Sequence, residues 1–339
     1  MSKSRPKVLI IGPVHLPSFK IGISLPFRHL RRKGVLTFET KSEQDITKET
    51  IAAVDIVVFV RSYSPGVYRF LKLANQLNKK TVYCIDDHFL AIPKNTPLGK
   101  VYHQPENKRA YLHFIQRSSV VRAPSQYFAN YIRKHYRKKN VVSFPGCVDF
   151  SLFDKLKKPA SNKSAIVIGY AGGPKPDAFG KVVPAMRRIL KEYPSKVRLE
   201  FFGYTPPALA GHKNVRSRKS ITDYREFVKE LYTSGWDIGL APLQNTLLHN
   251  CKTNNKFREY AACSIAGVYS DSPAYAGSVT HQENGIIVQD TEEGWYRGIK
   301  LLIDNPQLRK GIQKNAYKTA RSKFNIDVCA EKWRKMLLR

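Results

Sequence analysis

Three charged side chains in residues 252–262 have the types and the spacing to hold a sugar nucleotide. Lys252 and Lys256 precede Glu259, the single acid of the segment KTNNKFREYAA. A carboxylate can accept two hydrogen bonds from ribose hydroxyls, and lysines together with the N–H groups of a helix N-terminus can hold a pyrophosphate. The same charges would also suit an ordinary helix on the protein surface, so the flanking sequence has to decide between the two interpretations.

Two strand-like runs flank this segment. Asp237–Pro242 precedes it and Ile265–Ser270 follows it, which predicts the order strand, polar loop, helix, strand. From about Trp236 to Pro306 the chain resembles the C-terminal half of a GT-B glycosyltransferase of the large family called group 1 or family 4. In that family a DIGLAPL strand leads into a K-S-N-x-K-F-x-E-Y-A helix, and a second strand and a tail follow. Weaker similarity extends over nearly the whole chain. The matching tail residues are Tyr275, Val279, Gly285, Ile286, Ile287, Val288, Trp295 and Leu301–Pro306.

The resemblance implies that this half of the chain binds the donor. Glu259 matches the second glutamate of the family's E-x7-E motif, which holds the nucleotide ribose, whereas Cys251 stands where the first glutamate would be. The role of that first glutamate, contact with the donor sugar, therefore does not transfer. We expect Asn250, Thr253 and Asn254 to cover the donor-sugar region instead, and Lys252 and Lys256 to hold the phosphates.

A strand-end loop earlier in this half is the second donor candidate. Gly172 and Gly173 follow the strand-like run Ala165–Tyr170. Two glycines let the backbone approach a phosphate closely and leave N–H groups free, although such a pair also occurs in ordinary tight turns. In the resembled family this loop faces the donor phosphates, so we expect Gly172 and Gly173 to bind the donor.

Composition limits the class of protein. The chain has 339 residues, 42% of them hydrophobic, and a formal net charge of +32. This is enough for two ordinary domains, and the charge predicts an anionic partner such as a membrane surface, a polyanionic polymer or nucleic acid, unless it is only a basic background. Five scattered cysteines indicate free thiols in a reducing compartment, and no run reaches the roughly 18 apolar residues that a membrane span needs. We expect a cytoplasmic protein that can attach peripherally to the inner face of the membrane.

Strand-like and helical runs alternate along the chain. Each half begins with a short apolar run, Val8–Ile11 or Ala165–Tyr170, as in a buried parallel strand. The pattern predicts an α/β protein with two Rossmann-like, doubly wound domains. We place the N-terminal, acceptor-binding domain at 1–157 and the C-terminal, nucleotide-sugar-binding domain at 158–325, with a charged linker at 155–164. The resemblance implies the GT-B fold, with a cleft between the domains and a C-terminal helix, residues 326–339, that crosses back to the first domain.

The first half offers candidates for acceptor binding and catalysis at its predicted strand ends. Asp86, Asp87 and His88 follow one strand; two acids and a histidine suit acid–base work or metal binding, but also simple helix capping. His15 lies in the loop after the first strand, which lines the acceptor side in the resembled family. Arg61 ends another strand and could meet an anionic acceptor. The GT-B class generally needs no metal, so we expect no metal ion and no cofactor.

Two basic clusters lie on predicted helices of the first half. One is Arg28–Lys33, whose helix interleaves Leu25, Phe27 and Leu30, and this pattern suits anionic lipid headgroups. We expect the second cluster also to bind the anionic partner or acceptor, although either cluster could be a solvated charged face. The members of the second cluster are Arg133, Lys134, Arg137, Lys138 and Lys139.

Together these features predict a metal-independent, hexosyltransferase-type glycosyltransferase. It would move a sugar from a nucleotide-diphosphate sugar to an acceptor hydroxyl, with retention of configuration, on a lipid-linked glycan for surface polysaccharide biosynthesis. Two alternatives stay open. One is a glycosyltransferase that modifies the bases of DNA, which the charge suits equally well. The other is a catalytically inactive binding protein with the GT-B fold, which the missing first glutamate favours.

Overall fold

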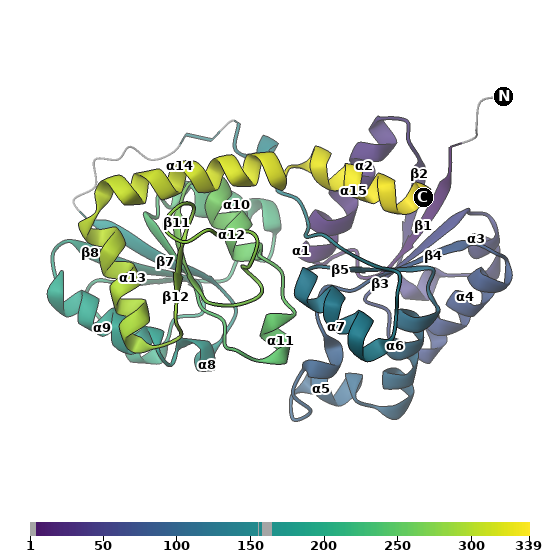
Figure 1. The fold of residues 1–339 in the computed structure, drawn as a ribbon, viewed down its shortest axis with the longest axis horizontal. Helices are drawn as coiled ribbons and strands as arrows, with labels where there is room; N and C mark the ends of the chain where they lie inside the picture. Colours follow the sequence, from purple (N-terminus) through teal and green to yellow (C-terminus); the bar gives the residue numbers. More distant parts are fainter. Residues whose placement is uncertain (1–4, 155, 158–164) are drawn as a thin grey trace. The chain divides into compact units, whose positions relative to one another are not determined.

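The computed structural model describes residues 5–154, 156–157 and 165–339, which form two compact units (Figure 1). Unit 1 comprises Met1–Cys147, Asn250–Thr253 and Asn325–Arg339, and unit 2 comprises Val148–His249 and Asn254–Phe324. Most of the predicted linker at 155–164 lies outside the described residues, so the domain boundary at 157 stays a prediction.

Unit 1 is built on a six-stranded parallel sheet with the order β2-β1-β3-β4-β5-β6. Continuous apolar runs such as IVVFV in β3 are buried along their whole length, because helices cover both faces of the sheet. On β3, Val58 packs in the cluster that contains α2 and α15, whereas Phe59 meets Phe114 of α6. The strands are β1 (Lys7–Ile11), β2 (Thr37–Lys41), β3 (Ile56–Val60), β4 (Lys80–Cys84), β5 (Val120–Ala123) and β6 (Val141–Ser143). The helices are α1 (Pro17–Phe19), α2 (Leu25–Arg32), α3 (Lys48–Ala52), α4 (Pro65–Gln76), α5 (Pro97–Tyr102), α6 (Pro105–Arg117), α7 (Gln126–Tyr136) and α15 (Ile326–Leu338).

The C-terminal helix α15 is part of unit 1, as the resemblance to GT-B glycosyltransferases implies. Trp333 is fully buried, its ring meets Phe27 of α2 edge-on at 4.8 Å, and its indole N–H donates to the carbonyl of Gly22 at 3.0 Å. At the end of the helix the ammonium of Lys80 donates to the carbonyls of Met336 and Leu337. A basic group there satisfies the free carbonyls of the last turn.

Unit 2 is a second six-stranded parallel sheet, with the order β12-β11-β10-β7-β8-β9. Its strands are β7 (Ile166–Gly172), β8 (Val197–Gly203), β9 (Val215–Arg218), β10 (Ile238–Ala241), β11 (Ala266–Ser270) and β12 (Ile286–Val288). Its helices are α8 (Pro176–Phe179), α9 (Val182–Glu192), α10 (Tyr224–Thr233), α12 (Asn255–Ala262), α13 (Glu292–Asp304) and α14 (Pro306–Lys323). The short helix α11 (Leu247–Asn250) also belongs to unit 2 except for its last residue, which is assigned to unit 1. One buried cluster joins alternate strand residues to α9 and α13, and Trp236 and Tyr260 pack on the other side of the sheet.

Three local features differ from the sequence-based expectations. The proline-bearing segment 89–105 contains α5, a helix that the sequence analysis does not predict; Pro97 begins it and the Thr96 side chain caps it. The strands β2 and β9 were not expected, because their sequences TFETK and VRSR are polar strands at sheet edges. Helix α12 begins at Asn255, so Lys252 precedes the helix in a loop.

No helix among the described residues is long and apolar enough to span a membrane.

Candidate functional site

The strand order of unit 2 identifies where a ligand should bind. Strands β7 and β10 are neighbours, and the chain builds β8 and β9 on one side of this pair and β11 and β12 on the other. In open parallel sheets ligands bind outside the carboxyl ends of the strands at such a switch point. The ends of β7 and β10 are therefore the place to look for donor-binding groups in unit 2.

Gly172 and Gly173 lie at this point, directly at the end of β7. Gly172 has a φ of 156°, and a Cβ there would lie 2.7 Å from the Tyr170 hydroxyl, so any side chain would force the buried Tyr170 ring to move. Two hydrogen bonds hold the loop: the backbone N–H of Tyr204 donates to the Gly172 carbonyl, and the side-chain hydroxyl of Tyr170 donates to the Gly173 carbonyl. A Cβ on Gly173 would meet nothing within 4 Å, so this residue presents bare backbone to its surroundings.

Glu259 and Lys256 form an ion pair on α12, beside the same strand ends. The Nζ–Oε2 distance is 2.5 Å, and the side chains are only 17% and 12% exposed for Lys256 and Glu259. Burial raises the pKa of the Tyr170 and Tyr275 hydroxyls, and the Glu259 carboxylate raises both further. Because Tyr170 also holds the Gly173 carbonyl, the carboxylate and the glycine loop belong to one site.

The other predicted donor residues divide between the units. Asn254 is buried in unit 2, where its amide donates to the Ser278 hydroxyl at 2.8 Å and its oxygen accepts from Arg258. Asn250, Lys252 and Thr253 pack within unit 1. The ammonium of Lys252 binds a carboxylate oxygen of Asp87 at 2.8 Å. Within unit 2, the contacts therefore connect the Gly172–Gly173 loop with Glu259 and Lys256 through Tyr170, whereas Asn254 is held by Ser278 and Arg258.

Unit 1 has a charged cluster at the carboxyl ends of β3 and β4. Arg61 pairs through one guanidinium nitrogen with Asp86 and lies 3.7 Å from Asp87. Burial acts to lower the pKa of Arg61, but the two carboxylates outweigh it and raise that pKa. The guanidinium also lies 5.0 Å from the centre of the Phe89 ring. With Lys252, the cluster has two cations, which can donate hydrogen bonds to a bound molecule, and two carboxylates, which can accept hydrogen bonds from it.

The backbone of Arg61 is unusual. Its φ of 61° lies in the left-handed region, which costs energy for a residue with a side chain and is enriched at functional sites. Its N–H donates to the Cys84 carbonyl at 2.9 Å, and this hydrogen bond holds the left-handed backbone of Arg61 against the end of β4.

The two candidate histidines lie in different environments. His88 is 2% exposed, stacks on Phe128 at 5.2 Å, and has its Nε2 3.1 Å from the Tyr136 hydroxyl. Burial lowers the pKa of His88 to about 4, so the ring is neutral near pH 7. His15 lies in the loop after β1 and is exposed. Of the four residues proposed for catalysis, Asp86 and Asp87 thus lie together, whereas His88 points into the interior of unit 1.

Sequence analysis missed three residues beside this cluster. Glu43 accepts a hydrogen bond from the Ser62 hydroxyl at 2.6 Å, and burial raises its pKa. Burial raises the pKa of Tyr102, and the positive charge of the nearby Arg61 guanidinium offsets part of that rise. Glu43 follows the polar strand β2, which the hydrophobic pattern did not reveal. Had β2 been recognised, the acid after it would have been a candidate by the same strand-end rule.

Among the described residues no group of three or more His, Cys, Asp or Glu side chains is placed to hold a metal ion. All five cysteines lie in the described part of the chain, where they are buried and form no disulfide.

The basic clusters of unit 1 are partly structural. Arg133 donates to the Val141 carbonyl and Lys138 to the carbonyls of Gln116 and Ser118. Lys134 and Arg137 are exposed. In α2 the apolar side chains Phe27 and Leu30 are buried in the core of unit 1, so α2 could meet a lipid surface through its basic groups only.

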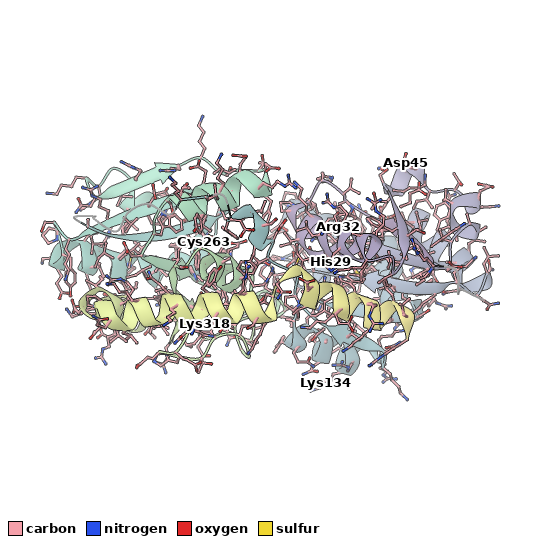
Figure 2. The ribbon with its side chains drawn as sticks, turned by 90° about the horizontal axis from the view of Figure 1, so that it is seen from above. His29, Arg32, Asp45, Lys134, Cys263 and Lys318 are labelled. Carbon is pink, nitrogen blue, oxygen red and sulfur yellow. The ribbon has the colours of Figure 1, made fainter. Side chains whose placement is uncertain are left out.

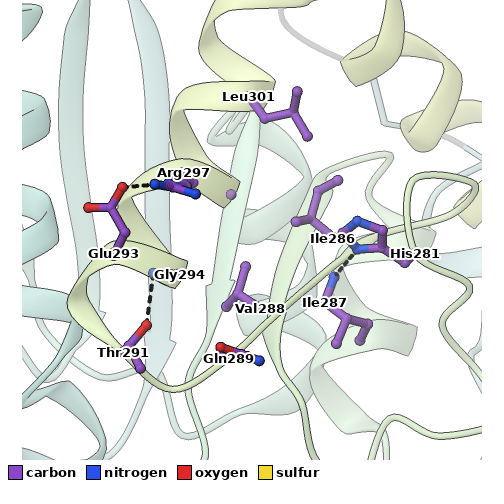
Figure 3. Close-up of a pocket in the computed structure, with 11 residues that line it drawn as sticks. His281, Ile286, Ile287, Val288, Gln289, Thr291, Glu293, Gly294, Arg297 and Leu301 are labelled. Carbon is purple, nitrogen blue, oxygen red and sulfur yellow. Dashed lines mark hydrogen bonds and ion pairs between the residues drawn. The ribbon is translucent and has the colours of Figure 1, made fainter.

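A pocket of about 420 Å³ lies elsewhere in unit 2, between the edge strand β12 and α13 (Figure 3). Its walls are mainly apolar, with an Arg297–Glu293 ion pair at 2.5 Å on the rim. His281 covers part of the edge of β12, because its Nδ1 accepts a hydrogen bond from the backbone N–H of Ile287 at 3.1 Å. None of the predicted site residues lines this pocket.

No family model matches the chain, and no curated protein sequence matches it. Solved structures do. HepE from Anabaena, in complex with UDP and glucose, superposes with a TM-score of 0.70 at 14% identity, over 98% of this chain and all of that one. A glycosyltransferase from Rickettsia africae gives 0.67 at 15% identity over 99% of both chains. Sucrose-phosphate synthase from Thermosynechococcus elongatus gives 0.70 at 12% identity over 98% of both chains.

These similarities extend over nearly the full length of both partners, and each unit has the parallel six-stranded sheet described above. The chain therefore has the GT-B fold, as its sequence predicts.

Proposed function

We propose that this protein is a glycosyltransferase that takes its sugar from a nucleoside-diphosphate sugar bound in unit 2. The observation that carries the proposal is the Glu259–Lys256 pair beside the Gly172–Gly173 loop, at the switch point of the sheet. The carboxylate would accept the two ribose hydroxyls, and Lys256 would turn from Glu259 to the diphosphate. HepE is seen with UDP and with UDP-glucose, which supports UDP as the first nucleotide to test.

The chemistry of transfer places demands that these groups meet. Negative charge develops on the leaving diphosphate, and fixed positive charge and N–H dipoles stabilise it in the transition state. Lys256 and the backbone of Gly173 would supply them without a metal ion. We propose that the reaction retains the anomeric configuration, as the resemblance to the group 1 family implies.

We propose that the acceptor binds to unit 1, at the cluster of Arg61, Asp86, Asp87 and Lys252. Asp86 would accept the proton of the attacking hydroxyl or orient it, since its pair with Arg61 uses only Oδ1. Both oxygens of Asp87 face a cation, Oδ1 toward Lys252 at 2.8 Å and Oδ2 toward Arg61 at 3.7 Å. A lipid-linked glycan at an anionic membrane surface is the first acceptor to test, and the net charge of +32 supports it. The same charge supports nucleic acid as the second candidate.

The experiment is a thermal-shift screen with UDP, GDP, dTDP and CMP and their sugars. A ligand that binds only the folded state stabilises it by mass action and so raises the melting temperature. At a ligand concentration of one hundred times the Kd, the free energy of unfolding increases by about 2.7 kcal/mol. We expect UDP and a UDP-sugar to raise it, and sugar transfer or slow hydrolysis to follow for that donor alone. If no nucleotide shifts the melting temperature, the donor site is wrong and the inactive binding protein becomes the better interpretation.

A further inference from the structure

Helix α14 of unit 2 carries a row of cations along one exposed face. Lys310, Lys314 and Lys318 follow one another at four-residue spacing, and Arg321 continues the row. All four are exposed. With a rise of 1.5 Å per residue, neighbouring lysines are about 6 Å apart along the axis, and the row is about 16 Å long. Helix α14 contains no acidic residue.

The three lysines of this row have no acidic partner among the described residues. Other cations nearby are engaged: Arg309 donates to the Leu302 carbonyl, and Arg321 lies 4.8 Å above the Phe150 ring. Lys300 already neutralises Asp304, which precedes the helix, at 3.1 Å. Glu283 is an acid that lies beside the middle of α14, because its backbone carbonyl accepts a hydrogen bond from the side-chain amide of Asn315. The row therefore has a strong, largely uncompensated positive potential.

The opposite face of α14 fixes the row in place. Ile312, Ala316 and Ala320 are buried, and the helix packs on α12, α13 and β11. Figure 2 looks down on α14 and shows it uncovered along its length, with Lys318 labelled. The large exposed apolar side chains of the described residues lie elsewhere. A helix that attaches to a bilayer buries an apolar face among the lipids, and α14 has already used its apolar face inside unit 2.

We propose that the basic row of α14 is a docking surface for double-stranded nucleic acid, held through its phosphates without sequence readout. A duplex carries one negative charge per 1.7 Å of axis and releases condensed counterions when cations replace them. A straight row of fixed, unpaired lysines on a protein with a net charge of +32 matches that chemistry. The surface is distinct from the donor site. It supports nucleic acid, which is the second of the two acceptor candidates given above.

The test measures binding of a fluorescent 20-base-pair duplex by anisotropy at several salt concentrations. The variant replaces Lys310, Lys314 and Lys318 by Gln, which has a similar helix propensity. The slope of log K against log salt changes by about 0.9 for each phosphate contact, so we expect it to become shallower by about 2.7. The matched control replaces Lys191, Arg225 and Lys229 by Gln; these are exposed helical cations of the same unit, the net charge is the same, and the slope should stay at the wild-type value.

Four outcomes would overturn the proposal: no duplex binding by the wild type, an equal loss in both variants, an unchanged slope in the α14 variant, or preference for phosphatidylserine vesicles over duplex. If the triple variant fails to fold by circular dichroism, the single change Lys314→Gln should still lower the slope by about 0.9. Nucleotide affinity should be the same in all variants, so failure of docking is distinguishable from failure of the donor site.

Discussion

Replacing Glu259 by Gln should separate ribose recognition from phosphate recognition in unit 2. Gln keeps the shape and one acceptor oxygen but loses the charge. Hydrogen bonds to a charged group contribute about 1.5–3 kcal/mol each, against about 0.5–1.5 for neutral ones. With two ribose hydroxyls bound, the loss should be about 2–3 kcal/mol, which raises the Kd about 30- to 150-fold.

The same change should leave the fold intact. It breaks the pair between Glu259 and Lys256, whose side chains are 12% and 17% exposed, and a partly exposed pair of this kind contributes about 1 kcal/mol. The melting temperature should therefore fall by only about 2–4 °C. A larger fall would mean that the pair is mainly structural.

The assay compares UDP with uridine by calorimetry and by competition. Glu259→Gln should weaken both ligands by the same factor, because both carry the ribose. Lys256→Gln should weaken UDP about tenfold and leave uridine unchanged. If Glu259→Gln weakens UDP but not uridine, the carboxylate acts through Lys256 and not on the ribose. If it weakens neither, the donor site lies elsewhere.

Three further predictions concern pH, stability and metal. Below pH 6.5 the unfolded chain protonates His88, whereas burial lowers the folded pKa to about 4. The stability that the neutral ring contributes is complete above pH 6.5 and is lost as the pH falls toward 4. Wild type should lose about 3 kcal/mol more than His88→Phe over that window in urea unfolding, and equal losses would contradict the burial argument. Lys80→Met should lower the free energy of unfolding by about 2 kcal/mol, because the ammonium donates to two carbonyls at the end of α15, both at 2.9 Å; an unchanged urea midpoint would show that this cap contributes nothing. Transferase activity should survive EDTA, and recovery of lost activity with Mg²⁺ or Mn²⁺ would contradict the metal-free mechanism.

The sequence predicts the elements with buried, periodic patterns and misses those without them. The apolar run Val8–Ile11 matches β1, and the strand-like run Asp237–Pro242 contains β10. The polar edge strand β2 has no such pattern, and the acid that follows it, Glu43, was missed with it. A strand-end rule can find functional residues only after the strand itself has been found.

For the candidate sites, sequence spacing predicts neighbours within one element but not across elements. Lys256 and Glu259 are three residues apart on α12 and form a pair. Lys252 is only four residues before Lys256, yet it precedes the helix and binds Asp87 of unit 1. His88 follows two partly buried carboxylates but points further inward, where the aromatic rings of Phe128 and Tyr136 pack against it. These placements depend on tertiary packing, which residue types alone do not reveal.

Hydrogen exchange of the wild-type protein with and without saturating UDP tests whether unit 2 binds the donor at its switch point. We expect slower exchange at the backbone N–H groups of Gly172 and Gly173 and in the first turn of α12, with no change along α14. If saturating UDP slows exchange at neither the glycine loop nor α12, unit 2 does not hold the donor at its switch point, and the proposed function fails.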